Sequence, residues 1–490
     1  MSINNVTKSN NSLTLHQQEV FENIVSNIDA RLSNILKTTN INDYLFSLMG
    51  SAGTGKTYLT TQIVKYLKEH HNEYTVKVTA PTHKAVGVLA GIFEENDIEV
   101  SCKTIHSFLG IKPFQDYKTG IEKFIIDKTK KEKETASLLI VDESSMISHE
   151  LYQYILETLE EERVEAVLFI GDPYQLLPVD GSETNIFDLP NKYELNEIVR
   201  QAKDSYIINL ATRVRERIKN QDFIELKKFI EENKEEKAAY FHNKNDFLND
   251  FYKNEKWYKE DKVIATHMNK DVTAFNKTVR NRFWEEKGNS TPPTLLPNDM
   301  LRFTELYSVN EVTIYHNGQV IKLDDAILKY HETLGIEYWE CKAVNTNKQQ
   351  VFRVIDPTSE KFFNDKLTQL ATLAKNTSWP ERKNIWRVFY QTRDMFAKVQ
   401  YIFSSTIHKL QGSTYDTSYI DIFGLAHNGN MSDDEKYRLL YVAITRARKD
   451  IKFFISSFDM TNQLSKHRNN EIDIKQSHQY IDENLKNLFK

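Results

Sequence analysis

The feature that most constrains the fold of this 490-residue chain is an apolar segment that leads into a glycine-rich loop and then a helical pattern. Residues 44–49 predict a buried strand, and the helical pattern begins near Lys56 and continues to about His70. The intervening GSAGTGKT at 50–57 matches G-x-x-x-x-G-K-[ST], which forms a phosphate-binding loop between a strand and a helix. The sequence therefore predicts an α/β fold with a phosphate site.

The residue types in this loop indicate a nucleotide site. The glycines allow the backbone to wrap with its N–H groups pointing inward, and the helix N-terminus adds partial positive charge. Lys56 is expected to reach the β- and γ-phosphates, and the Thr57 hydroxyl to bind Mg²⁺. We therefore expect ATP and Mg²⁺ as cofactors. The expected cofactor-binding residues here are Gly53, Thr54, Gly55, Lys56 and Thr57.

A second buried strand, residues 137–141, runs directly into Asp142 and Glu143. An acidic pair at the end of an apolar strand, downstream of a phosphate loop, is the Walker B arrangement. We expect Asp142 to hold Mg²⁺, directly or through water, and Glu143 to orient and deprotonate the attacking water. A third strand, residues 164–170, is followed by Gln175, which could sense the γ-phosphate.

Other polar residues have two interpretations on the sequence alone. Gln17 lies in a helix that Thr14 is expected to cap, and its amide either faces solvent or pairs with the edge of adenine. Thr82, His83 and Lys84 follow the strand at 74–79, where α/β sheets bind ligands, but a helix cap and a solvated lysine explain them equally well.

Bulk composition restricts the class of protein. The chain is 40% hydrophobic and 27% charged, as in soluble globular proteins, and its length suits roughly three or four compact units. No apolar run approaches the roughly 20 residues that span a bilayer, and the polar N-terminus is unlike a signal peptide. Two cysteines are too few for a disulfide framework or a zinc site, so we expect a cytoplasmic protein, in the host cytoplasm if viral. The net charge of −5 excludes coating of nucleic acid by bulk charge but allows a local basic groove.

The rest of the chain divides into inserts and a second αβ unit. Residues 111–135 are polar and aromatic, with a predicted hairpin turn at 117–120 and lysines that most simply form a solvated face. The αβ pattern resumes at 262–266, changes to a mixed, β-rich pattern over 300–399, and returns near residue 400. The tail, 461–490, is polar.

Taken in order, the motifs resemble the superfamily 1B DNA helicases of the RecD/Dda branch, whose members include Dda-like bacteriophage helicases. The resemblance extends from Leu13 to Arg448. The matching stretches are LTLHQQ, GSAGTGKT, APTHKA, TIHSFLG, DESSM, GDPYQLLPV, LNEIVRQ, STIHKLQGSTYD and LLYVAITRARKD.

The resemblance implies two RecA-like P-loop NTPase lobes with ATP between them. By motif, Gln17 reads adenine, Gln175 links the γ-phosphate to the DNA path, and Arg200 and Arg446 reach the γ-phosphate from the second lobe. Arginine forks suit this role because they stabilise the oxygens of the transferring phosphoryl group. The implied catalytic residues are Lys56, Glu143, Gln175, Arg200 and Arg446.

The resemblance also implies the domain boundaries. The first lobe comprises 1–110 and 136–190, with a β-hairpin insert at 111–135. The second lobe comprises 191–299 and 400–460, with an SH3-like β-rich insert at 300–399.

The expected nucleic-acid contacts are short polar side chains that suit phosphates, which position a strand without reading its sequence. They are Thr82, His83, Thr104, His106, Thr406 and His408. The family's A-[FY]-T-N-K stretch is one residue longer here, at 265–270, so no contact is assigned to it. Phe124, with Phe114 second, is the candidate strand-separating wedge, against the alternative that both rings pin the hairpin to the lobe.

The leading functional hypothesis is an ATP-dependent 5′→3′ helicase that translocates on single-stranded DNA and unwinds duplex. Alternatives are an RNA helicase, a protein-displacing translocase and an ATP-gated single-strand clamp; DNA and RNA are not distinguished by these motifs. Expected partners are single-stranded and tailed or forked duplex DNA, with a single-strand-binding protein or replisome component as a further candidate. We expect a monomer that does not bind membranes.

Overall fold

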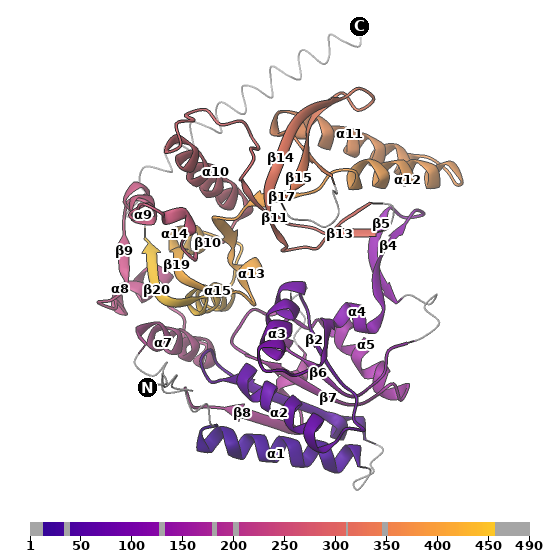
Figure 1. The fold of residues 1–490 in the computed structure, drawn as a ribbon, viewed down its shortest axis with the longest axis vertical. Coiled ribbons are helices and arrows are strands. Elements are labelled where there is room, and N and C mark those ends of the chain that lie inside the picture. The colour runs from indigo at the N-terminus through magenta and orange to yellow at the C-terminus, as the bar shows by residue number, and fades with distance from the viewer. Residues whose placement is uncertain are drawn as a thin grey trace, which may run out of the picture.

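The computed structural model describes residues 13–33, 40–126, 133–178, 184–198, 205–309, 312–344 and 351–455. Figure 1 shows a first lobe, a second lobe beside it, and an insert that extends from the second lobe toward a hairpin of the first. Arg200, the lysines at 128, 130 and 131, and the tail at 461–490 lie outside the described residues.

The first lobe is built on a parallel sheet, six-stranded within the described residues, in the order β3-β2-β6-β7-β1-β8. Its strands are β1 (Leu45–Gly50), β2 (Val76–Ala80), β3 (Ser101–Thr104), β6 (Ala136–Val141), β7 (Val164–Gly171) and β8 (Asn191–Leu195). Its helices are α1 (Leu15–Leu32), α2 (Lys56–His70), α3 (His83–Glu95), α4 (Ile105–Leu109) and α5 (His149–Glu160). Because β8 pairs with β1, the first lobe extends beyond the boundary predicted at residue 190.

Both faces of this sheet are covered, which explains why its strands are continuously apolar. Alternate residues point to opposite faces: Phe46 and Leu48 pack with α1, α2 and α3, whereas Leu139 and Phe169 pack with α4 and α5. The carboxyl ends of the strands, where the candidate residues lie, all meet at one edge.

The second lobe repeats this design with the parallel order β18-β10-β19-β20-β9. The strands are β9 (Ala239–Phe241), β10 (Lys262–Thr266), β18 (Ser404–Thr406), β19 (Tyr415–Asp421) and β20 (Ala447–Phe454). The helices are α7 (Tyr206–Asn220), α8 (Leu226–Glu232), α9 (Lys244–Phe251), α10 (Asn269–Glu285), α13 (Ile407–Leu410), α14 (Ile422–Ala426) and α15 (Asp433–Thr445). The predicted two-lobed α/β fold is confirmed.

The insert is an antiparallel sheet, ordered β16-β15-β14-β11-β17, with two helices between β16 and β17 in the sequence. The strands are β11 (Met300–Phe303), β14 (Val320–His331), β15 (Ile336–Ala343), β16 (Phe352–Ile355) and β17 (Val399–Tyr401), with a separate hairpin of β12 (Tyr307–Val309) and β13 (Val312–Tyr315). The helices are α11 (Pro357–Asn376) and α12 (Glu381–Asp394). The insert therefore ends at residue 401, and α11 was not predicted; the SH3-like assignment stays a prediction.

The predicted hairpin in the first lobe consists of β4 (Ile111–Asp116) and β5 (Ile121–Ile126). Its tip lies against α12 (Figure 1), where Gln115 donates to Asp394 at 2.8 Å and Arg393 pairs with Glu122 at 3.1 and 3.2 Å. Gly120 has a φ of +71° and faces Trp386 so closely that a Cβ atom there would lie 2.0 Å from the indole ring. The insert thus braces the hairpin.

A buried ion pair fixes the insert to the second lobe. Arg280 of α10 binds the Asp299 carboxylate through Nε and Nη2 at 3.0 and 2.8 Å, just before β11. Asp299 also accepts from Trp284 Nε1 at 3.0 Å and the Leu296 N–H at 2.8 Å. Both oxygens of the Asp299 carboxylate therefore accept hydrogen bonds at the junction between the second lobe and the insert.

We expect Asp299→Ala to lower the free energy of unfolding by about 3–5 kcal/mol, because it leaves the buried Arg280 guanidinium unpaired. Urea unfolding checks this value. As a control, Glu305→Ala removes the exposed pair with Lys398 and should change the free energy by no more than about 1 kcal/mol. If both variants matched the parent, the ion pair would not anchor the insert.

Candidate nucleotide and nucleic-acid site

The phosphate loop has the backbone that its sequence predicts. Gly53 and Gly55 each have a φ of +84°, in the left-handed region that glycine adopts without strain. A Cβ atom on Gly50 would lie 2.5 Å from the Thr54 hydroxyl oxygen. Lys56 Nζ donates to the carbonyl oxygens of Gly50 and Ser51 at 2.6 and 3.2 Å. The ammonium group is therefore held across the loop at the N-terminus of α2.

Gln17 is tied to the same loop. Its side-chain nitrogen donates to the Thr54 carbonyl at 2.9 Å, and its oxygen accepts from the Thr14 N–H at 3.1 Å in a capping box that begins α1. The side chain is buried rather than solvent-facing. Recognition of adenine by Gln17 stays a prediction.

Asp142 and Glu143 follow β6 at the edge that faces Lys56. The pKa of Asp142 is raised above its ordinary value, because burial and the Glu143 carboxylate disfavour the charged form. The Lys56 ammonium opposes this shift but does not reverse it. Glu143 has a φ of +52°, a strained conformation for this residue type that is most often found at functional sites. The Lys56 ammonium is close enough to Asp142 to influence its pKa, and Thr57 follows Lys56 in α2. A carboxylate and a hydroxyl are oxygen donors of the kind that Mg²⁺ takes, so these two residues are compatible with the metal site, which stays a prediction.

Tyr441 of α15 connects the second lobe to this loop. Its hydroxyl donates to the Asp172 carboxylate at 2.6 Å and accepts from the Ala52 N–H at 3.3 Å. Nearby, Arg438 Nη1 donates to the carbonyl oxygens of Pro173 and Gln175 at 2.7 and 2.8 Å. The segment after β7 is therefore held by α15.

Gln175 lies between the two lobes, as its predicted linking role requires. It is buried, and its side-chain oxygen accepts from Gln411 Nε2 at 3.4 Å. Gln411 follows Thr406 and His408, two of the predicted strand contacts in the second lobe. This hydrogen bond thus joins the segment after β7 in the first lobe to the segment of the second lobe that carries the predicted nucleic-acid contacts.

Arg446 is buried next to the acidic pair. Its guanidinium donates to the carbonyl oxygens of Val442 and Ser413 at 3.1 and 3.2 Å and to the Thr445 hydroxyl at 3.1 Å. Burial lowers the pKa of Arg446, and the charge of the Glu143 carboxylate is the largest influence that opposes this shift. Arg446 therefore belongs to the same site as Glu143, whereas Arg200 falls outside the described residues.

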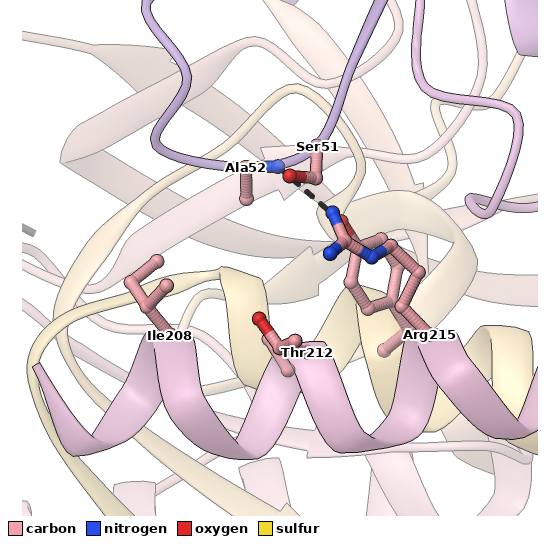
Figure 2. Close-up of a pocket in the computed structure, with 7 residues that line it drawn as sticks. Ser51, Ala52, Ile208, Thr212 and Arg215 are labelled. Carbon is pink, nitrogen blue, oxygen red and sulfur yellow. Dashed lines mark hydrogen bonds between the residues drawn. The ribbon is translucent and has the colours of Figure 1, made fainter. Parts of the chain in front are cut away.

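A further cation, Arg215, faces the loop from α7. Ser51 and Ala52 lie opposite a row formed by Ile208, Thr212 and Arg215 (Figure 2), and Tyr441 completes the lining of the small pocket between them. These three α7 residues are spaced so that they share one face of the helix. The sequence gives no signal for Arg215, because a charged residue on an amphipathic helix usually faces solvent.

The predicted strand contacts lie at corresponding edges of the two sheets. Thr82 follows β2 and Thr104 is the last residue of the neighbouring strand β3, and their hydroxyls accept from the Ala85 and Ser107 N–H groups at 3.2 Å. Both threonines are therefore helix caps. Lys84, in contrast, is not simply solvated, because its ammonium lies 5.6 Å from the centre of the Tyr415 ring. In the second lobe, Thr406 is the last residue of β18 and the N-cap of α13.

Histidines gather along these edges. The rings of His83 and His316 are 4.1 Å apart, those of His106 and Phe124 are 5.8 Å apart, and those of His267 and His408 are 6.0 Å apart. Loss of hydration lowers the pKa of His83, His106, His267 and His408. His316, from the insert, was missed because no spacing in the sequence connects it with His83.

The two candidate wedge rings lie on opposite faces of the hairpin. Phe124 pairs with Pro113, whereas Phe114 pairs with Lys123, so their side chains point to opposite sides. Phe124 is 61% exposed and Phe114 44% exposed. Neither ring is packed into the lobe; the hairpin is held instead by contacts from Gln115 and Glu122 to the insert. Only Phe124 lies beside a predicted strand contact, His106.

Within the described residues, no helix combines the length and apolarity that crossing a membrane requires.

Comparison with known proteins agrees with this geometry. Residues 34–181 match the AAA domain, and residues 401–451 match the UvrD-like helicase C-terminal domain. The chain is 26% identical over 446 residues to the ATP-dependent DNA helicase dda of Enterobacteria phage T4, which covers 85% of this chain and 96% of the phage protein. It is also 26% identical over 498 residues to an uncharacterised protein of Acanthamoeba polyphaga mimivirus, over 86% of this chain and 97% of the viral protein.

Among solved structures, that of Pif1 helicase from Bacteroides in complex with ADP-AlF3 and ssDNA covers 94% of this chain and 97% of its own. The sequence identity is 17% and the TM-score is 0.45, which is too low to establish a shared arrangement of domains.

Two parallel-sheet lobes that meet at one phosphate loop define a P-loop NTPase of the helicase class. The chain is similar to the superfamily 1B helicases, the group related to Dda, Pif1 and RecD.

We expect Glu143→Gln to bind ATP and lose turnover, because the amide keeps the shape of the carboxylate but cannot accept a proton. Lys56→Ala should lose binding and turnover together. Nucleotide binding and phosphate release, measured separately, distinguish the two variants. Hydrolysis by Glu143→Gln at the parental rate would contradict the assignment of Glu143 as the base.

Arg446→Ala should bind ATP nearly as the parent does and lose about 10³-fold in turnover, as is typical of an arginine finger. Single-turnover hydrolysis with saturating strand measures this loss. Arg448→Ala is the matched control, because Arg448 is exposed and forms ion pairs only with Asp261 and Asp416 among the described residues. Equal turnover in the two variants would contradict a catalytic role for Arg446.

Proposed function

We propose that this chain is an ATP-dependent DNA helicase that translocates 5′→3′ on single-stranded DNA and unwinds duplex. The observation that carries the proposal is the Gln175–Gln411 hydrogen bond, which joins the segment after β7 in the first lobe to the segment of the second lobe that carries the predicted nucleic-acid contacts. The similarity to the phage helicase over most of both chains supports DNA as the substrate.

In the proposed reaction, water attacks the γ-phosphorus and the bond to the β–γ bridging oxygen breaks, giving ADP and phosphate. Glu143 accepts the proton of the attacking water, and Lys56 and Arg446 stabilise the charge of the transferring group. Mg²⁺, held by Thr57 and Asp142, would neutralise phosphate charge. Gln17 would bind adenine with the second hydrogen of its side-chain amide, because the first is donated to the Thr54 carbonyl. Arg200 would act as a second arginine finger, beside Arg446.

Movement along the strand follows from this arrangement. ATP draws the lobes together through contacts that both lobes supply, and hydrolysis releases them, so the two strand-contacting edges alternate their grip. Thr82, His83, Thr104 and His106 hold phosphates on the first lobe, and Thr406 and His408 hold them on the second. His316 adds a contact from the insert, because its ring lies against His83.

The proposed setting is that of a monomeric cytoplasmic enzyme acting on tailed or forked DNA, with a single-strand-binding protein or replisome component as partner. The test is strand-stimulated ATPase on DNA and RNA oligomers, followed by unwinding of 5′-tailed and 3′-tailed duplexes. We expect stimulation by DNA and unwinding of the 5′-tailed duplex only. Stimulation by RNA alone, unwinding from the 3′ tail, or binding without turnover would each overturn the proposal.

Strand separation is assigned to Phe124. A ring stacked on the last unpaired base is worth roughly 1–3 kcal/mol, comparable to a base-pair step of about 1.4 kcal/mol. We expect Phe124→Ala to keep DNA-stimulated ATPase and translocation and to lose unwinding. Phe114→Ala, on the opposite face of the hairpin, is the matched control and should unwind normally. Full unwinding by both variants would exclude both rings, and unwinding lost only in Phe114→Ala would transfer the role to that ring.

A further inference from the structure

An exposed tryptophan lies beside the tip of the hairpin. Trp379, in the turn between α11 and α12, is 53% exposed. The Lys118 ammonium, from the hairpin turn, and the Lys383 ammonium, from α12, each lie 5.8 Å from the centre of its ring. Together with Arg382 these residues form what we call the tip pocket. Lys118, Trp379 and Arg382 line a hollow of about 320 Å³, within the size range of small-ligand sites.

The tip pocket carries positive charge that carboxylates do not neutralise directly. In the described part of the chain, none of its three cations forms an ion pair: Arg382 Nε donates to the Thr377 carbonyl at 2.8 Å, and the two lysines contact the Trp379 ring. The nearby Asp116 carboxylate binds the Lys118 N–H and the Thr119 hydroxyl of its own turn. Arg393, farther along α12, differs because its guanidinium is paired with Glu122.

The brace between hairpin and insert does not depend on this tryptophan. The Tyr117 and Tyr390 rings are 5.9 Å apart, Trp386 covers Gly120, and Glu122 pairs with Arg393. Trp379 therefore exposes a large apolar face that neither the core nor the brace requires. Proteins that bind single-stranded nucleic acid use exposed aromatic rings flanked by cations. The bases stack on the ring, and the phosphates contact the cations.

We infer that the tip pocket binds the displaced strand of forked DNA, with one base stacked on Trp379 and the backbone phosphates on Lys118, Arg382 and Lys383. The inference rests on the proposed helicase function. Phe124, beside the tracking-strand contact His106, lies four residues from the tip, or about 13 Å at 3.3 Å per residue. The strand that leaves the duplex at Phe124 therefore has the tip pocket within a few nucleotides' reach.

The experiment compares the binding of a 5′-tailed duplex, a 3′-tailed duplex and a fork carrying both tails, each labelled in the duplex, with a non-hydrolysable ATP analogue present. The parent should bind the fork more tightly than either tailed duplex. Trp379→Ala should weaken fork binding by about 5- to 150-fold, the range for one stacked base, and leave binding of the duplex with the tracking tail unchanged. Trp379→Phe should restore most of the fork affinity, because it keeps an aromatic face.

Two further variants separate the contributions. Leu373→Ala removes another exposed apolar side chain, on α11, and should change nothing. The Lys118→Ala/Arg382→Ala double variant should reduce the salt dependence of fork binding by about 1.4 in log–log slope, the value for two phosphate contacts on a single strand.

Unchanged fork affinity in Trp379→Ala would overturn the inference, as would an equal loss on all three substrates, which would indicate a structural role. A parent that unwinds the 5′-tailed duplex but gains no affinity from the second tail would also overturn it while leaving the proposed function intact. A parent that unwinds none of the three substrates would instead contradict the proposed function.

Discussion

The contact between the second lobe and the phosphate loop is made by the hydroxyl group of Tyr441. It donates to Asp172 and accepts from the Ala52 N–H, so it joins α15 of the second lobe to the phosphate loop and to the end of β7. Burial and the Asp172 carboxylate raise the pKa of Tyr441 well above its ordinary value, and the group therefore keeps its proton. Only a neutral hydroxyl can donate to a carboxylate and accept from an N–H group at once. Because Ala52 belongs to the phosphate loop, this hydroxyl places α15 in direct contact with the segment that is predicted to bind the nucleotide.

The residues predicted to contact the nucleic-acid strand are connected to this hydroxyl through the segment after β7. Gln175 lies three residues after Asp172 and bonds to Gln411, while Arg438 of α15 holds the intervening backbone. We therefore expect a displacement of α15 at the phosphate loop to be transmitted to the segment that carries Thr406 and His408. The hairpin is coupled to the same movement, because the insert that braces it is fixed to α10 through the Arg280–Asp299 ion pair.

Local sequence signals predicted the elements that local physics determines. The phosphate loop, the acidic pair after β6, the hairpin turn at 117–120 and the cap at Thr14 all match the structure. What sequence could not predict depends on contacts between distant residues. The inclusion of β8 in the first sheet depends on pairing with β1, the contact of His316 with His83 joins the insert to the first lobe, and Arg215 faces the loop only because α7 docks there. Helix α11 did carry a local signal, Asp356 as N-cap followed by Pro357, but buries only Phe363 and Ala374 and so has a weak apolar pattern.

The most direct test of this account is the effect of a non-hydrolysable ATP analogue on affinity for a labelled single strand, measured in the parent and in Tyr441→Phe. The account predicts that the analogue changes the parental dissociation constant by about tenfold or more, in the usual range of coupling between two sites. In Tyr441→Phe, nucleotide and strand should each still bind, but the analogue should alter strand affinity by much less. An unchanged ratio in the variant would contradict the central claim that this hydroxyl links the nucleotide loop to the position of the lobes.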